Sequence, residues 1–397
     1  MTVDVHAPLP LLGGLTPTLF MRRFWQRRPL LVRQAWPGVR APLARAELFA
    51  LAARDDVESR LVQRRGDAWA VQQGPFARRR LPPLARPGWT LLVQGLDLHV
   101  PAAHEMLARF SFLPAARLDD LMTSWASAGG GVGPHADSYD VFLLQVQGRR
   151  RWRVAPPGDG AFVPGLPLKI LQRFDPPQDW LLEPGDMLYL PPRWGHDGVA
   201  EGGECMTCSV GLRAPSAPEL ARELLQRIAD EAGEANGDAA AAIDPPLYAD
   251  ATQAATTTPG AVPPALLHFA SRAVAAALRD PQALARALGE YLSEPKPRVW
   301  FDAAAVRARI SAPPALQLDA RTRMLYDARH IFVNGESYRA AGRDARLLRR
   351  LADERSLPAG EAARLSAAAQ ACVQEWLQAG WLQTAGWRPN EPKERLT

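Results

Sequence analysis

The first half of the chain alternates apolar and polar residues or runs in short apolar blocks, a pattern typical of strands. Residues 139–144 form one strand-like run, Gln147-Gly148 is typical of a turn, and residues 149–154 predict a return strand. A short apolar strand at 187–190 lies between a Pro-Gly turn and the stop signal Pro191-Pro192. These elements predict an antiparallel sheet domain.

After about residue 215 the spacing of apolar residues becomes helical. A capping-box pattern at 216–219 precedes apolar residues recurring every four positions, which predicts a helix. Residues 233–262 are rich in Gly, Ala, Thr and Pro and predict a loop or a partly ordered linker. Two more helices are expected, at 265–278 and directly after Asp280-Pro281.

The last hundred residues change pattern again. Asn334-Gly335, inside the apolar run 331–338, is a strong signal for a tight hairpin turn. Helices are predicted on its C-terminal side, at 343–354 and 361–379. A hairpin combined with helices indicates a small third unit.

Composition sets bounds on these units. A chain of 397 residues with 47% apolar content is long enough for two or three domains and a large core. The net charge of +5 and a pI near 9.4 permit approach to an acidic surface. Since the basic residues are dispersed, and residues 361–370 carry little basic character, we do not expect direct nucleic-acid binding.

The cysteines and the first residues bear on location. Cys205 and Cys208 have metal-knuckle spacing, but on a strand residues three apart face opposite ways, so we expect neither a metal knuckle nor a redox pair. Three unpaired cysteines suit a reducing compartment. No basic-then-apolar leader and no membrane-length apolar segment is visible, so the expectation is a soluble, cytoplasmic protein without membrane contact.

His135-Ala136-Asp137, preceded by the glycine-rich residues 129–134, carries the clearest chemistry, together with His196. On a strand, side chains two apart share a face, so His135 and Asp137 can address one centre. Two imidazoles and a carboxylate are the facial triad of non-haem Fe(II), which leaves coordination positions open. The triplet alone could arise by chance, and its context favours the metal site. A structural zinc site would need four protein ligands.

The order of these motifs resembles the JmjC-type cupin oxygenases that use Fe(II) and 2-oxoglutarate. Within that group the chain is most similar to the bacterial ribosomal oxygenases, which hydroxylate an arginine of a large-subunit ribosomal protein. The similarity covers most of residues 15–215. It rests on these stretches: Arg28-Pro29-Leu30-Leu31-Val32, Asp119-Asp120-Leu121-Met122, residues 129–135, Tyr139-Asp140-Val141-Phe142 and residues 148–154.

The resemblance implies an α+β fold with a double-stranded β-helix, the jelly-roll cupin of JmjC proteins, as catalytic domain. This domain would span 1–215. A helical dimerisation region would follow at 216–296, with a flexible linker near 233–262, and a winged-helix-like domain at 297–397. Related enzymes use the helical segment to form homodimers, and the alternative is that these helices only cover the barrel.

The resemblance also implies roles for single residues. His135, Asp137 and His196 would be the metal ligands and catalytic centre, with Fe(II), 2-oxoglutarate and O2 as cofactor and cosubstrates. Arg150 would hold the distal carboxylate of 2-oxoglutarate, and Ser124 would add a hydroxyl to that pocket. Strand alternation allows either Arg150, or Arg149 with Arg151, to face the barrel interior.

The expected substrate is an arginine side chain, hydroxylated at C3. Asp119, Asp120 and Tyr139 are candidates for binding its guanidinium, although both aspartates could instead cap a turn before Leu121. Two other functions stay open. One is a JmjC-type hydroxylase or demethylase acting on histidine or lysine of another protein, or on a small molecule. The other is a non-enzymatic winged-helix binding protein with a vestigial cupin site.

Overall fold

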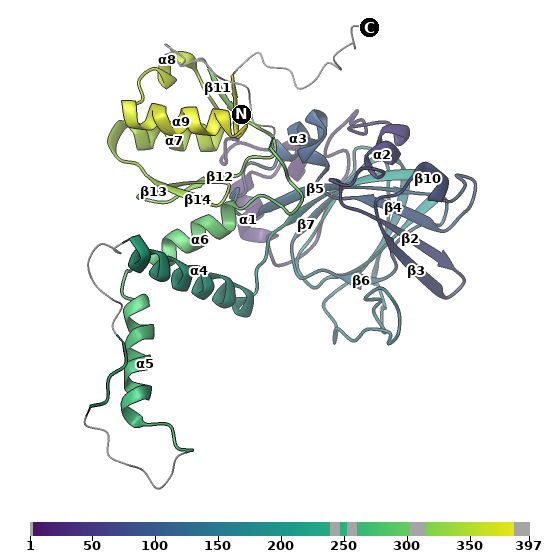
Figure 1. Ribbon diagram of the computed structural model, residues 1–397. Helices are drawn as coiled ribbons and strands as arrows, with labels where there is room; N and C mark the ends of the chain where they lie inside the picture. Colours follow the sequence, from purple (N-terminus) through teal and green to yellow (C-terminus); the bar gives the residue numbers. More distant parts are fainter. Residues whose placement is uncertain (1–2, 239–246, 252–259, 302–314, 385–397) are drawn as a thin grey trace, which may run out of the picture.

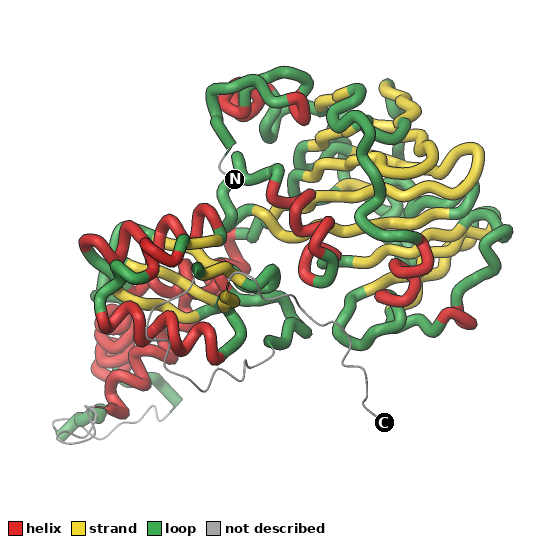
Figure 2. Tube along the Cα trace, turned by 90° about the horizontal axis from the view of Figure 1, so that it is seen from above, coloured by secondary structure: helices red, strands yellow, loops and turns green. Residues whose placement is uncertain are grey.

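The computed structural model describes residues 3–238, 247–251, 260–301 and 315–384. It has a large sheet region formed by the N-terminal half and a smaller mixed region formed by the C-terminal part (Figure 1). The helices α4 (Ala217–Asp238) and α6 (Ala283–Ser293) lie next to the smaller region, whereas α5 (Pro264–Ala277) extends away from it (Figure 1). Seen from above, the strands of the large region stack on one side of the molecule and most of the helices gather on the other (Figure 2).

The large sheet is antiparallel in every pairing recorded for it, with strand order β1-β9-β7-β10-β5-β4-β2-β3. The short strand β6 pairs with β10, and β8 pairs with β7. The strands are β1 (Leu30–Val32), β2 (Ser59–Arg65), β3 (Ala68–Gln73), β4 (Trp89–Val93), β5 (Leu118–Ala126), β6 (His135–Ala136), β7 (Val141–Ala155), β8 (Gln178–Leu182), β9 (Met187–Leu190) and β10 (Gly195–Leu212).

Strands β7 and β10 organise this sheet, because β7 pairs with β8, β9 and β10, and β10 pairs with β5, β6 and β7. The predicted turn at Gln147-Gly148 is wrong: β7 continues from Val141 to Ala155 as one strand. Gly148 has a φ of 64°, and the register with β10 shifts opposite it, between Glu201 and Met206. The glycine therefore forms an irregularity that bends the strand. A glycine in the sequence indicates such a bend and a turn equally well.

The core beneath the sheet is rich in aromatic rings. Phe20 of the first helix packs on Tyr189 and Phe142 with ring centroids 5.0 and 5.7 Å apart, and Trp89 packs on Trp125 at 4.5 Å. Burying such large side chains is a main source of stability. The covering helices are η1 (Pro10–Leu12), α1 (Pro17–Arg23), α2 (Arg45–Leu51), η2 (Arg78–Arg80), η3 (Leu96–Leu98) and α3 (Pro101–Ala108).

Three helices connect the two regions: α4 (Ala217–Asp238), α5 (Pro264–Ala277) and α6 (Ala283–Ser293). The predicted capping box is present, since Ser216 and Glu219 exchange side-chain to backbone hydrogen bonds of 3.2 and 3.3 Å. The prediction of a loop from residue 233 is wrong for 233–238, which continue α4. Most of the remaining predicted linker, 239–246 and 252–259, lies outside the described residues.

The C-terminal region has two three-stranded sheets and three helices among its described residues. The Asn334-Gly335 hairpin joins β13 to β14 as predicted, but the helix expected at 361–379 is two helices, the second capped by Ser366. The elements are β11 (Leu316–Leu318), β12 (Met324–Tyr326), β13 (His330–Val333), β14 (Glu336–Arg339), α7 (Gly342–Glu354), β15 (Ser356–Leu357), α8 (Ala359–Ala362), α9 (Ala367–Gln378) and β16 (Leu382–Thr384).

Specific contacts join the regions. A side chain on Gly289 of α6 would meet the Phe332 ring of β13 at 2.3 Å, so glycine allows this helix to pack directly on the small sheet. Arg323 donates a 2.8 Å hydrogen bond to the carbonyl of Leu118 at the start of β5. Among the described helices, none combines the length and apolar character needed to cross a bilayer.

Candidate metal and cosubstrate site

The structure brings His135, Asp137 and His196 together. One potential ligand atom from each side chain lies within 4.8 Å of the others. His135 on β6 and His196 on β10 are paired residues of adjacent strands, and their ring centroids are 4.2 Å apart. Asp137 follows the end of β6, and its Oδ2 is 3.6 Å from Nε2 of His196. Pairing of β6 with β10 thus closes the 61-residue gap (196 − 135) between the histidines.

Backbone carbonyls fix the orientation of both imidazoles. Nδ1 of His135 is 2.9 Å from the carbonyl oxygen of Gly133, and Nδ1 of His196 is 2.9 Å from that of Trp194. A carbonyl only accepts, so each Nδ1 carries the proton and each Nε2 keeps its lone pair. This is the arrangement that holds a histidine as a metal ligand.

The surroundings of His196 keep its ring neutral. The side chain is buried, and burial together with the neighbouring His135 ring lowers the pKa of His196 to about 4. At neutral pH the ring is therefore an electron-pair donor and not a cation. A neutral pair of imidazoles beside one carboxylate fits a divalent cation.

Arg150 faces the barrel interior, as one of the two options from strand alternation required. It is 5% exposed, whereas Arg151 pairs at the surface with Glu201 and Asp179. Nη1 of Arg150 donates to Oγ of Ser124 at 3.4 Å, but its Nε and Nη2 have no partner among the described residues. A buried guanidinium with unused donors is costly unless an anion binds it.

Trp152 lies between Arg150 and His196. Its ring is 5.6 Å from the Arg150 guanidinium and 5.9 Å from the His196 ring. The strand places these groups on one face, because 150, 152 and 154 alternate with the outward positions and Val154 pairs with His196. Four strand residues span about 13 Å. The long side chain of Arg150 reduces the distance from its guanidinium to the metal ligands to one that a small dicarboxylate can bridge.

The two aspartates lie in β5, so the turn-capping alternative is wrong. Asp120 is 6% exposed and accepts a 2.8 Å hydrogen bond from the amide of Gly95. Nζ of Lys296, from the segment after α6, is 2.9 Å from Oδ2 of Asp120 and 3.2 Å from Oδ2 of Asp119. Both carboxylates are thus already neutralised in part by a lysine.

Tyr139 lies outside any strand and is 38% exposed. A Cβ on Gly211 would lie 4.0 Å from its ring and 3.7 Å from Oδ1 of Asp120, so the two side chains flank one position. Burial of its hydroxyl end and the Asp137 carboxylate raise the pKa of Tyr139. The phenol therefore stays protonated and can donate a hydrogen bond between the triad and the aspartates.

Comparisons with known proteins agree with this site. Residues 105–220, which include the whole triad, match the JmjC domain family. This chain carries a JmjC domain. Residues 276–383 match the ROXA-like winged helix, which confirms the predicted fold class of a cupin domain followed by a winged helix.

Two curated proteins are similar to this chain in sequence. The ribosomal protein uL16 3-hydroxylase of Escherichia coli is 41% identical over 203 residues, 51% of this chain and 53% of that protein. A probable ribosomal oxygenase of Haemophilus influenzae is 37% identical over 210 residues, 52% of each chain. The chain thus spans about half the length of these curated relatives.

A solved structure extends the likeness to almost the whole chain. The E. coli ribosomal oxygenase YcfD in complex with cobalt and 2-oxoglutarate has a TM-score of 0.72 and 28% identity, covering 94% of this chain and 99% of that one. The resemblance of this chain to the bacterial ribosomal oxygenases is confirmed.

Sequence reasoning missed three features of this site and its surroundings. Trp152 could have been found, because it shares strand parity with Arg150. Lys296 is one of only three lysines beside 44 arginines (47 − 3), a weak signal, and its position depends on tertiary packing. A cavity of about 530 Å³ beside Asp137 was also not expected; it is walled by Ala136, Ser138, residues 155–160, Phe162, Leu171, residues 173–175, Arg193 and Gly195.

A second buried carboxylate accompanies Asp120. Asp97 of η3 accepts a 2.8 Å hydrogen bond from the amide of Leu121. Burial and the nearby Asp120 raise the pKa of Asp97 to about 7. The aspartates of this region therefore cannot all be ionised without cost.

Proposed function

We propose that this protein is a 2-oxoglutarate- and Fe(II)-dependent hydroxylase that modifies C3 of an arginine in a large-subunit ribosomal protein. The observation that carries the proposal is the pairing of an intact His-Asp-His cluster with the buried, unsatisfied Arg150. The E. coli relative named as a ribosomal protein uL16 3-hydroxylase supports the substrate class. The cobalt and 2-oxoglutarate of the related solved structure support the cofactors.

His135, Asp137 and His196 would hold the metal through two Nε2 atoms and one carboxylate oxygen. Three ligands on one face leave the other coordination positions to cosubstrate and O2. When bound, the iron couples decarboxylation of 2-oxoglutarate to succinate with insertion of one oxygen atom into a C–H bond. The protein's residues position the reactants, so no general base is required.

Arg150 would bind the distal carboxylate of 2-oxoglutarate. Its free Nε and Nη2 can make two parallel hydrogen bonds to that carboxylate, while Ser124 accepts from Nη1. Trp152 forms the wall between this end and the metal.

Asp119, Asp120 and Tyr139 would bind the substrate guanidinium. Asp120 and Tyr139 flank one position next to the triad, and carboxylates pair well with a planar guanidinium. Lys296 already contacts both aspartates, so the incoming arginine would share them or displace the lysine.

We further propose a homodimer formed through the helical region and a cytoplasmic location, where ribosomal proteins are met. Helix α5 projects away from the rest of the molecule (Figure 1) and exposes apolar side chains, Leu267 and Val274 at 64% and 62%. A partner would cover this face. We also propose that the chain divides into a catalytic domain at 1–215, a helical region at 216–296 and a winged-helix domain at 297–397.

The direct test is incubation of the iron-loaded protein with 2-oxoglutarate, O2 and ribosomal proteins stripped from large subunits, followed by peptide mass spectrometry. We expect one arginine to gain one oxygen atom in step with succinate formation. The control variant is Asp179→Ala, which loses an exposed carboxylate outside the site and should hydroxylate the same arginine as the native protein does. Oxygen gain on histidine, loss of methyl groups from lysine, or succinate without protein modification would each contradict the proposal.

A further inference from the structure

A second cavity lies in the winged-helix region, far from the triad in the sequence. It has a volume of about 690 Å³ and lies between the start of α6, the open end of the β13–β14 hairpin and the first two turns of α7. We name it the arginine groove. Its lining residues, none of them acidic, are Gln282, Ala328, Arg329, Arg339, Ala340, Ala341, Gly342, Ala345, Arg346 and Arg349.

Most of the positive charge in the groove is unpaired. Arg329, Arg339 and Arg346 are exposed, and their guanidinium groups make no ion pair or hydrogen bond within the part of the chain that the structure describes. Other arginines of the same region differ; Arg350, one residue after the groove, binds both Glu354 and Glu361. Like charges this close together repel, which favours binding of an anion.

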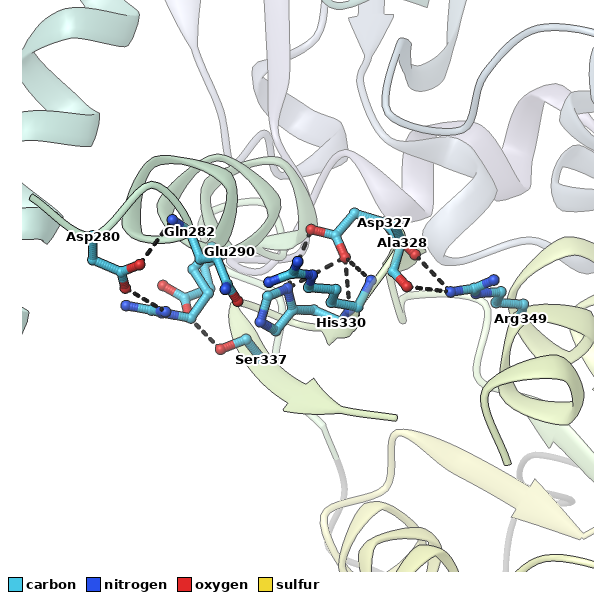
Figure 3. Close-up of polar contacts among 10 residues, drawn as sticks. Asp280, Gln282, Glu290, Asp327, Ala328, His330, Ser337 and Arg349 are labelled. Carbon is cyan, nitrogen blue, oxygen red and sulfur yellow. Dashed lines mark hydrogen bonds and ion pairs between the residues drawn. The ribbon is translucent and has the colours of Figure 1, made fainter. Parts of the chain in front are cut away.

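The fourth arginine is anchored. Nη2 of Arg349 donates to the carbonyls of Asp327 and Ala328 at 3.1 and 2.8 Å (Figure 3). These bonds fix its position without neutralising its charge, because carbonyls are uncharged. Arg349 therefore adds a pre-positioned cation to the wall of the groove.

The carboxylates around the groove are already occupied. Asp327 accepts from the amides of Arg329 and His330, and Glu290 accepts from Ser337 at 2.6 Å. Figure 3 shows these pairs and Asp280 at the opposite end, where it accepts from the amide of Gln282. Asp280 also pairs with Arg286, outside the groove. None of the three makes an ion pair within 4.0 Å with a groove arginine among the described residues. Arg339 lies near enough to Asp280 to help lower the pKa of that carboxyl, after the Gln282 amide and Arg286, so its charge is offset in part.

The backbone adds to the positive potential. Helix α7 begins at Gly342 with no side chain capping its first turn, so amide groups at its N-terminus lack intrahelical partners. That end also carries the positive pole of the helix dipole. Four of the other lining residues are alanines, and small side chains let a chain of phosphates approach closely.

We propose that the arginine groove binds the phosphate backbone of RNA. Planar guanidiniums and open helix amides suit phosphate oxygens, and the groove offers no aromatic side chain on which a base could stack. Binding should therefore be independent of base sequence. The choice of RNA among polyanions rests on the proposed function, since a ribosomal protein substrate is met next to ribosomal RNA.

This inference revises the expectation of no direct nucleic-acid contact. That expectation rested on the dispersal of basic residues along the sequence and on residues 361–370, where basic side chains are few. The basic residues come instead from three separate places: the residue before β13, the end of β14 and one face of α7. Only the fold brings them together.

The test measures fluorescence anisotropy of an RNA oligonucleotide of about 20 nucleotides with the full-length protein, without iron, 2-oxoglutarate or protein substrate. We expect Arg339→Ala/Arg346→Ala to weaken binding at least about tenfold, uniformly across RNA sequences. The slope of log affinity against log salt should become shallower by about 1.4, as for two lost phosphate contacts. The matched control is Arg22→Ala/Arg23→Ala, two exposed arginines of α1, with an expected change under about twofold.

Three results would overturn the proposal: no RNA binding by the native protein at about 50 mM salt, equal weakening by both double variants, or equally tight binding of polyglutamate at the same groove. The last would assign the groove to an acidic protein surface. Unchanged thermal unfolding of both variants excludes misfolding. Because the RNA assay contains no hydroxylase components, its outcome is independent of hydroxylation. RNA binding here, together with no arginine hydroxylation in the peptide mass-spectrometry test, would refute the proposed function and leave the groove proposal standing.

Discussion

Arg150 in the barrel and Arg346 in the winged-helix region are the same side chain in opposite surroundings. Arg150 is 5% exposed, and two of its donor nitrogens, Nε and Nη2, have no partner among the residues that the structure describes. Arg346 is exposed and belongs to a cluster whose charges are screened by water and salt. On the proposals above, the first arrangement would select one anion of defined size, and the second would attract any phosphate chain.

The difference lies in what each environment costs. A buried guanidinium without a partner is expensive, so its site is stable only when a complementary anion fills it. An exposed cluster costs little to keep, and its affinity falls as salt rises. We therefore expect the affinity for 2-oxoglutarate to vary little with salt, in contrast to the affinity for RNA.

Removal of the triad carboxylate should have the largest effect. Asp137→Ala leaves two imidazoles and should lower arginine hydroxylation by at least about a thousandfold, with loss of tight metal binding. Asp179→Ala should retain full activity, since within the described part of the chain its carboxylate pairs only with Arg151, at the surface. Succinate formation and metal content report the two effects. If Asp137→Ala hydroxylated arginine as well as the native protein does, Asp137 would not be a metal ligand.

Arg150→Met should come next. The substitution keeps much of the side-chain volume but removes the cation, and we expect the KM for 2-oxoglutarate to rise about a hundredfold, near 3 kcal/mol. Arg149→Met changes the adjacent exposed arginine and should alter KM by less than about twofold. Initial rates at varied 2-oxoglutarate distinguish them. If both variants raised the KM for 2-oxoglutarate equally, only the net charge of the protein would matter, and the proposed difference between buried and exposed arginines would be wrong.

Asp97 tests a buried charge through pH. Its pKa of about 7 lies above the ordinary value of 3.8, so the native state binds the proton more tightly than the unfolded state, and stability is lost as pH rises through 7. Asp97→Asn cannot ionise. Relative to the native protein it should gain on the order of 2 kcal/mol in free energy of unfolding between pH 5 and pH 8, because the unfolded carboxyl is already ionised at pH 5 and the native one ionises only near pH 7.

Denaturant unfolding at both pH values measures this difference, with the exposed Asp55→Asn as control. The groove variant Arg339→Ala/Arg346→Ala keeps Asp97, so the difference between its free energy of unfolding and that of the native protein should be the same at both pH values. A stability difference between Asp97→Asn and the native protein that is the same at both pH values would contradict the account.

Ser124→Ala should have the smallest effect. It removes one 3.4 Å hydrogen bond to a cation that keeps its other donors for the cosubstrate. We expect the KM for 2-oxoglutarate to rise about fivefold, close to 1 kcal/mol, with kcat little changed. A rise as large as that for Arg150→Met would mean that Ser124 itself binds the cosubstrate.

The sequence allowed prediction of those features that depend on local parity and motif. Strand alternation placed His135 near Asp137 and limited the inward cation to two options. It could not distinguish the bend at Gly148 from a turn, because both need a residue with positive φ. Lys296 and the arginine groove depend on segments that meet only after folding, so no spacing along the chain indicates them.

The most direct measurement of the central claim is the visible absorption of the Fe(II)-loaded protein titrated with 2-oxoglutarate in the absence of O2. Chelation of the iron by the cosubstrate should produce a new band that neither component gives alone. The account predicts this band for the native protein, its loss in Asp137→Ala, and about a hundredfold more 2-oxoglutarate to produce it in Arg150→Met. No band in the native protein, or an unchanged titration in Arg150→Met, would contradict a single site built from the triad and Arg150.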